Sequence, residues 1–94
     1  FNAYRAIAQR ADLDAVLHLG DYIYEYANGT YGNGEPIGRA PLPNREIVSL
    51  ADYRERYAQY RTDADLQEVH RQHPFFVVWD DHESANDAWQ NGAE

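Results

Sequence analysis

The stretch that decides the fold runs from residue 75 to residue 83 and reads FFVVWDDHE. Its first five residues are aromatic or β-branched, and Pro74 precedes them. This composition is typical of a strand with both faces buried, as strands of parallel sheets are. The sequence therefore predicts a buried strand over Phe75–Trp79, with two aspartates, a histidine and a glutamate directly after its carboxyl end.

An earlier segment repeats this organisation. Residues 15–20 read AVLHLG, and Asp21 follows the glycine. A nearly continuous apolar run that ends in Gly-Asp predicts a second buried strand. We expect His18, inside this run, to be a core residue with hydrogen-bond partners.

The residues between the two predicted strands contain a loop and two helices. Gly and Pro recur closely over residues 28–43, which predicts a long loop. Ser49 and Asp52 form a predicted capping box for one helix, with an apolar stripe of Leu50, Tyr53, Tyr57 and Tyr60. We expect the arginines of this helix (Arg54, Arg56 and Arg61) to point away from that stripe.

Two further helices are predicted from start signals. A Thr62-to-Asp65 capping box predicts a helix that Pro74 ends, and Asn2 is expected to cap a helix over Ala3–Arg10. His70 and His73 have the i, i+3 spacing of a metal pair, but no carboxylate stands with them. We interpret them as surface residues or as charges near the helix C-terminus.

Two buried strands joined by a helical crossover form a βαβ unit, so we expect an α/β fold with two parallel strands. The carboxyl ends of neighbouring parallel strands meet at one crevice, where ligands bind. Asp21 and Asp81 are therefore expected to lie close together. Carboxylates and one imidazole at such an edge suit hard or borderline cations. The alternative is that these acids are solvated or cap the next helix, for which Ser84 and Asp87 are candidates.

Composition limits the classes of partner. The chain has 94 residues, a net charge of −8, no cysteine and 44% hydrophobic residues. The negative charge argues against nucleic acid and anionic membranes as partners, and the lack of cysteine excludes disulfides and thiolate metal sites. No apolar stretch approaches the ~18 residues of a membrane span. Because a chain this short cannot cover two-sided strands, we expect self-association or a partner that buries Phe75–Trp79.

Three blocks carry a specific resemblance. They are HLGDYIYE at residues 18–25, DYRERYAQYR at residues 52–61, and WDDHE at residues 79–83 with Asn86. In this order and spacing they resemble the PhoD-like alkaline phosphatases, which belong to the calcineurin-like metallophosphoesterases. The resemblance runs from about Ala11 to Asn91. It implies that residues 1–94 are part of one α/β-sandwich catalytic domain, in a family that is usually secreted or periplasmic, although this chain shows no signal-peptide pattern.

The resemblance also implies roles for individual residues. Asp21 matches the carboxylate that bridges two metals, and Tyr24 matches a tyrosine that binds iron(III). Asp81 stands where the wider superfamily has a ligand of the second metal, and its charge suits calcium. His82 matches the histidine that contacts the phosphate and the leaving-group oxygen. Supporting positions around these ligands are expected for Glu83, Asn86 and Asp80.

The implied reaction is hydrolysis of phosphomonoesters or phosphodiesters by a hydroxide that two metals activate. Iron(III) and calcium are the implied cofactors, with other divalent metals as options. The family's other ligand blocks are absent from these residues, so we expect a central fragment of the catalytic domain that is inactive alone. Two alternatives stay open: a catalytically incomplete, self-associating fragment with weak or no metal binding, and an acidic calcium-binding module.

Overall fold

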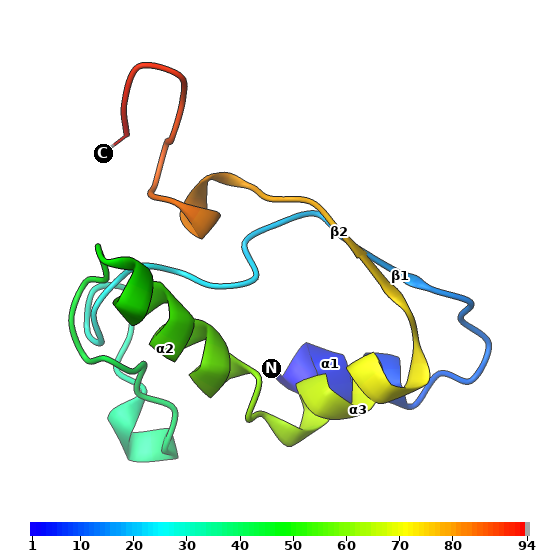
Figure 1. The fold of residues 1–94 in the computed structure, drawn as a ribbon. Coiled ribbons are helices and arrows are strands. Elements are labelled where there is room, and N and C mark those ends of the chain that lie inside the picture. Colours follow the sequence, from blue (N-terminus) through cyan, green and yellow to red (C-terminus); the bar gives the residue numbers. More distant parts are fainter. Residues whose placement is uncertain (94) are drawn as a thin grey trace.

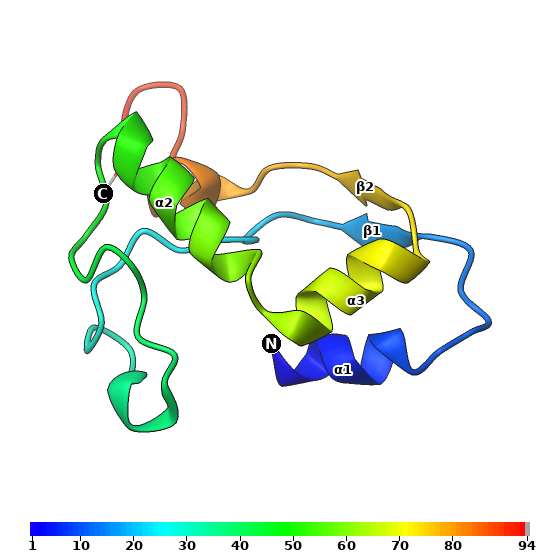
Figure 2. The same ribbon diagram turned by 60° about the horizontal axis from the view of Figure 1, so that its bottom comes forward.

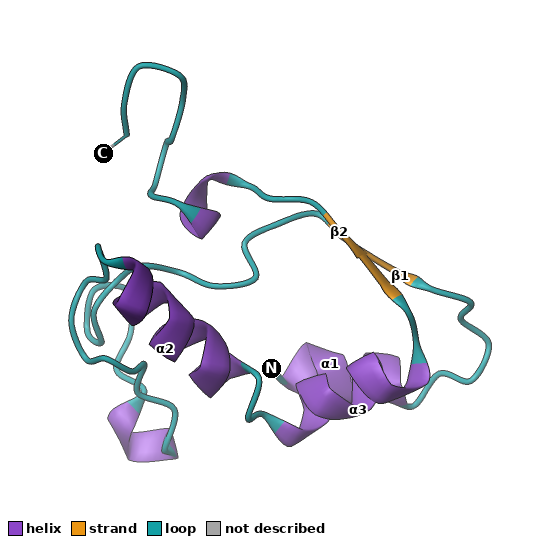
Figure 3. Cartoon of the chain, viewed as in Figure 1, coloured by secondary structure: helices purple, strands orange, loops and turns teal. Residues whose placement is uncertain are grey.

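The computed structural model describes residues 1–93. Its elements are α1 (Asn2–Ala8), β1 (Val16–His18), the 3-10 turn η1 (Glu35–Ile37), α2 (Leu50–Tyr60), α3 (Ala64–Gln72), β2 (Phe75–Val77) and the 3-10 turn η2 (Asp81–Glu83). Figure 1 shows α1, α3 and the two strands together, with α2 set apart from them. Between β1 and α2 lies a long loop segment, as predicted, interrupted only by η1 (Figure 3).

The two strands pair in parallel, which confirms the predicted α/β unit with a helical crossover. Val16 lies opposite Phe75, and His18 lies opposite Val77. The ladder extends slightly beyond the strands, since the Val78 amide donates to the His18 carbonyl at 3.1 Å. Both strands are shorter than predicted because only three residues of each are paired.

The prediction that both faces of the strands are buried is wrong for residues 1–93. Figure 2 shows α1 and α3 on one side of the strand pair. The other side is open: Leu17 is 72% exposed and Phe76 is 63% exposed. Continuous apolar character indicated two-sided burial, but among the described residues only one layer of helices is present to supply it.

The start of α2 follows the sequence closely. Ser49 Oγ accepts a hydrogen bond from the Asp52 amide at 3.2 Å, and Asp52 Oδ2 accepts one from the Ser49 amide at 3.4 Å. This reciprocal pair confirms the predicted capping box.

The starts of α3 and α1 differ from the prediction. Asp63, not Thr62, caps α3, because its carboxylate reaches the Leu66 amide at 2.9 Å. Asn2 was expected to cap α1 but is its first helical residue, and Phe1 occupies the cap position without a side-chain hydrogen bond.

The inner face of α2 combines part of the predicted apolar stripe with buried charged residues. Tyr53 and Tyr60 pack against the core, as predicted, and Tyr57 stacks on Tyr22. The prediction that Arg56 points away from this face is wrong.

Leu50 is 66% exposed and Tyr57 is 38% exposed, whereas Asp52 and Arg56 are buried. The Arg56 guanidinium turns inward because the loop offers it carbonyl acceptors. These belong to Tyr24, Tyr26, Leu42, Pro43 and Arg45. Arg56 therefore fastens both ends of the loop segment to α2.

The core is small and lies where α3 meets the chain after β1. Tyr22, Ile23 and Leu66 form its buried centre. His73 is 6% exposed, and the His70 ring stacks on Phe75 with centroids 3.8 Å apart. The interpretation as surface residues is therefore wrong for His73, which is buried at the C-cap of α3. His70 is half-buried and lies in the last turn of α3, near the helix C-terminus as the second interpretation had it.

His18 has the hydrogen-bond partners that were predicted for it. Its Nε2 lies 3.2 Å from Tyr4 Oη, and its Nδ1 accepts from the Gly20 amide at 3.3 Å. The ring thus joins α1 to the end of β1.

The folded chain exposes more surface than its mass predicts. Its accessible area is 6524 Å², whereas a compact monomer of 10.9 kDa has about 5600 Å². The radius of gyration is 14.3 Å, against about 12 Å for a compact domain of this length. No helix within residues 1–93 is both long and apolar enough to cross a membrane.

Candidate metal centre

The two strands leave the sheet side by side, and the first turn after β1 requires glycine. Gly20 has a φ of +102°, and a Cβ built there would lie 2.3 Å from the Asp80 amide nitrogen. Asp21 follows with a φ of +53°, a conformation that costs energy for a residue with a side chain. The Gly20-Asp21 turn thus lets the two strand ends approach closely enough for their acids to meet.

Glu83 links these two strand ends. Its Oε2 accepts hydrogen bonds from the amides of Asp21 at 2.9 Å and Asp80 at 2.7 Å. Its Oε1 accepts from the Tyr22 amide at 2.6 Å. One carboxylate therefore positions the backbone on both sides of the candidate centre.

Asp80 caps the short turn η2. Its Oδ1 accepts from the Asp81 amide at 2.9 Å, and with Glu83 it forms a capping box. The alternative that acids after the strands act as caps is therefore correct for Asp80, although the sequence pointed to Ser84 and Asp87 for that task.

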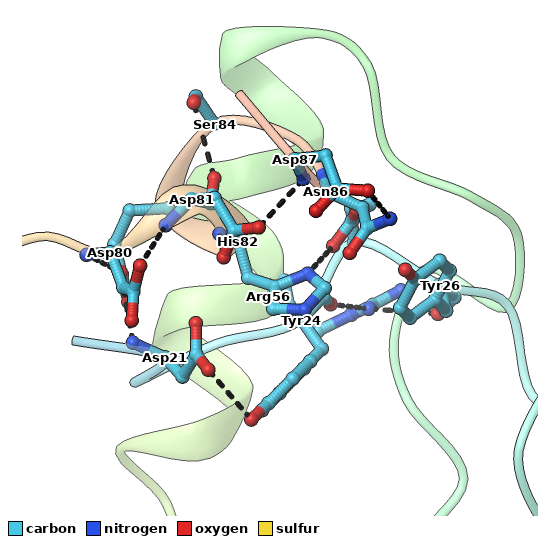
Figure 4. Close-up of polar contacts among 12 residues, drawn as sticks. Asp21, Tyr24, Tyr26, Arg56, Asp80, Asp81, His82, Ser84, Asn86 and Asp87 are labelled. Atoms are coloured by element: carbon cyan, nitrogen blue, oxygen red, sulfur yellow. Dashed lines mark hydrogen bonds and ion pairs between the residues drawn. The ribbon is translucent and has the colours of Figure 1, made fainter. Parts of the chain in front are cut away.

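Asp21, Asp81 and His82 come together at this edge (Figure 4). Each offers one ligand atom, and these atoms lie within 4.8 Å of one another. Two ligands on opposite sides of one ion at ~2.4 Å are separated by about that distance, so the three could share a cation. The predicted proximity of Asp21 and Asp81 is confirmed.

The surroundings of Asp21 show whether this site is suited to a cation. Its Oδ1 is buried and has no hydrogen-bond partner within residues 1–93. A buried carboxylate oxygen without a partner is costly, and a bound cation would remove that cost. The oxygen and nitrogen donors around it are also those that hard and borderline cations prefer.

Tyr24 lies beside Asp21. Its hydroxyl donates to Asp21 Oδ2 at 3.2 Å. Burial, together with the charge and hydrogen bond of Asp21, raises the pKa of Tyr24 to about 12. Without a cation the phenol therefore keeps its proton at neutral pH, and a metal that takes it as a ligand must displace that proton.

Asp81 is held as an anion by backbone amides. Its Oδ2 accepts from the Asp87 amide at 2.6 Å, and its Oδ1 accepts from the His82 amide at 2.9 Å. The Asp87 amide is the largest cause of a lowered Asp81 pKa. Asp81 is thus ionised and fixed before any metal binds.

Glu25 orients His82, and sequence reasoning gave Glu25 no role. Its side chain is buried, and its Oε2 lies 2.7 Å from His82 Nδ1. Burial by itself lowers the pKa of His82, but the hydrogen bond and charge of Glu25, with Asp21 and Asp81, raise it overall. Because Nδ1 is engaged by Glu25, Nε2 is the His82 nitrogen left for a ligand.

Asn86 supports this arrangement through its backbone. Its amide donates to Glu25 Oε1 at 2.7 Å, and its side-chain nitrogen donates to Asp87 Oδ2 at 3.4 Å. Glu25 is in the block HLGDYIYE, four residues after Asp21, and that position is the only signal that could have pointed to it. Its burial depends on residues 82–86, about sixty positions away, so no local pattern marks it.

Comparison with known proteins assigns the chain to a family. A family model described as PhoD-like phosphatase matches residues 1–94. The chain belongs to the PhoD-like phosphatase family. The match covers every residue of the candidate centre, and it confirms the resemblance carried by the three sequence blocks.

Two relatives within the PhoD-like phosphatases support the assignment. The chain is 47% identical over 87 residues to alkaline phosphatase D of Bacillus subtilis (strain 168), which covers 92% of this chain and 14% of that protein. A solved structure of PhoD matches with a TM-score of 0.72 and 46% identity, covering 85% of this chain and 15% of its own. The chain thus spans about a seventh of the curated relative's length.

Proposed function

We propose that these residues form part of the metal centre of a phosphoric ester hydrolase that acts on phosphomonoesters or phosphodiesters. The observation that carries the proposal is the meeting of Asp21, Asp81 and His82 at the ends of paired parallel strands, with an unpartnered Asp21 oxygen among them. Family membership supports the reaction class.

Each residue has a proposed role. Asp21 would bridge two metals, Tyr24 would bind iron(III), and Asp81 would bind a second, harder ion such as calcium. The family resemblance supports iron(III) at Tyr24, because a phenol binds a metal as the phenolate, and such a ligand must lose its proton when the metal binds. When bound, such a pair supplies Lewis-acid stabilisation of the phosphoryl group and activates water.

His82 would act on the leaving group. Glu25 fixes its Nδ1, and its raised pKa helps it to hold a proton on Nε2. A protonated imidazole in that position can donate to the ester oxygen as it departs. Glu83 and Asp80 would keep the strand ends in register, and Asn86 would keep Glu25 in place.

The centre proposed here needs donors from outside these residues. Two metal ions require more ligands than Asp21, Tyr24 and Asp81 supply. We therefore infer that residues 1–94 act as the middle of a larger catalytic domain, and that the open strand face is covered in the working protein, by that domain or by a second copy. The family resemblance further supports a secreted or periplasmic location, and the net charge of −8 supports the exclusion of nucleic acid and anionic membranes as partners.

The test is an Asp21→Asn substitution in the full-length gene product. We expect most of the hydrolysis of a chromogenic phosphate ester to be lost, with a fall in bound iron and calcium measured by mass spectrometry. Asp12→Asn is a matched control, because Asp12 is exposed, is paired with Arg10 at 2.7 Å, and precedes the amino end of β1, whereas the centre follows the carboxyl end of that strand. The isolated 94 residues should turn over negligibly.

Two results would contradict these statements. Near-normal activity and metal content in the Asp21→Asn protein would refute the bridging role of Asp21. Robust metal-dependent hydrolysis by the 94 residues alone would refute the inference that further ligands are needed.

A further inference from the structure

A cavity of about 610 Å³ opens beside the candidate metal centre. The loop segment after Tyr24 forms most of its wall, and Tyr60 of α2 closes one side. Both Tyr24 and His82 line it, so the cavity and the metal centre share two residues. In Figure 4, Tyr26 lies on the far side of His82 from Asp21, so His82 stands between Asp21 and this cavity-lining tyrosine.

The wall of the cavity is a continuous series of rings. The Tyr24 and His82 rings have centroids 4.5 Å apart, and those of His82 and Tyr26 are 5.4 Å apart. Tyr26 then meets Tyr31 edge to face at 4.8 Å. Aromatic surface therefore extends without a break from the donors of the centre to the outer loop. Such surface favours stacked or edge-to-face contact with another ring.

This wall is held in place before any ligand arrives. Arg56 donates to the carbonyls of Tyr24 and Tyr26, which fixes the backbone under two of the rings. Further along, Asn28 closes the loop: its side chain donates to Asn33 Oδ1 and accepts from the Gly34 amide, both at 2.8 Å. A preformed apolar cavity with few polar groups is the usual form of a small-molecule site.

We propose that this ring-lined cavity binds the alcohol part of the phosphate ester and favours aromatic or cyclic alcohols. The inference rests on the proposed function, because the position of the ester at Asp21, Asp81 and His82 decides which part of the substrate enters the cavity. An ester whose phosphoryl group lies at those donors can direct its alcohol along Tyr26 toward Tyr31. Tyr31, which is 83% exposed, then determines specificity at the outer end of the wall.

The test compares two esters in the full-length gene product. The measured quantity is the ratio of kcat/KM for 1-naphthyl phosphate to kcat/KM for ethyl phosphate. We expect Tyr31→Ala to lower this ratio about five- to tenfold and Tyr31→Phe to preserve it, because the ring and not the hydroxyl makes the contact. Val48→Ala is the matched control, since Val48 is equally exposed and does not line the cavity. It should leave the ratio unchanged.

A second measurement separates this inference from the proposed function. 1-Naphthol is titrated by calorimetry into the metal-free protein, and Tyr31→Ala should weaken its binding at least fivefold. Hydrolysis of neither ester by the unmodified protein would contradict the proposed function, while the naphthol titration would still decide the cavity. An unchanged ester ratio together with unchanged naphthol binding, or no naphthol binding at all, would overturn the inference.

Discussion

Arg56 offers the most direct test of how this chain holds the loop segment that follows the candidate metal centre. Its side chain is fully buried, and its guanidinium donates to five backbone carbonyls. The substitution Arg56→Met keeps the length of the apolar stem and removes every one of these donors. The carbonyls of the loop segment then lose the group that fastens them to α2.

The number of hydrogen bonds lost in Arg56→Met sets the expected size of its effect on loop opening. A net hydrogen bond contributes about 0.5–1.5 kcal/mol, and buried acceptors left without a donor cost more. Because some loop carbonyls can reach water once freed, we expect local opening to become easier by about 3 kcal/mol. At about 1.4 kcal/mol per factor of ten, the open population of the loop should rise on the order of a hundredfold.

Hydrogen exchange measures this opening directly. The Ile47 amide is a suitable reporter, because it donates to the Glu25 carbonyl at 2.9 Å and its side chain is 1% exposed. Exchange of the peptide that contains Ile47 should accelerate on the order of a hundredfold in Arg56→Met. Arg54→Met, on the exposed side of the same helix, should change it less than threefold. An Arg56→Met protein that exchanges at the unmodified rate would refute the reasoning.

Two further predictions concern the turn after β1 and the core. Gly20→Ala should lower the urea midpoint much more than Gly29→Ala, because both glycines have φ near +100° but only the Gly20 Cβ would meet backbone, at 2.3 Å from Asp80; equal midpoints would contradict this. Burial lowers the pKa of His70, so its contribution to stability is present above pH ~6.5 and is lost as the pH falls below that value. His70→Gln should therefore flatten the fall in Tm between pH 7.5 and 5.5, and an unaltered slope would count against this role of His70.

Local sequence patterns were sufficient to predict the helices and strands, and to predict that the main site residues lie close together. The apolar runs that precede Gly20 and Asp80 predict strands, and a helical crossover between them predicts parallel pairing. Parallel pairing places both strand ends at one edge, so the proximity of Asp21 and Asp81 follows from the sequence. The capping box at Ser49 is equally local, since its two hydrogen bonds join residues three apart.

Only the tertiary structure showed which side chains are buried and which residues bury them. Glu25 holds His82, and Arg56 holds the loop, through contacts 57 and up to 32 residues apart in the chain. The open face of the strand pair is decided in the same way, because apolar residues such as Leu17 and Phe76 are covered only where another layer packs on them. A short sequence window encodes the conformation of its own backbone and the polarity of its faces. It does not encode which distant carboxylate, carbonyl or helix is brought against them, and for that reason only the assembled chain determined the orientation of His82 and the buried state of Arg56.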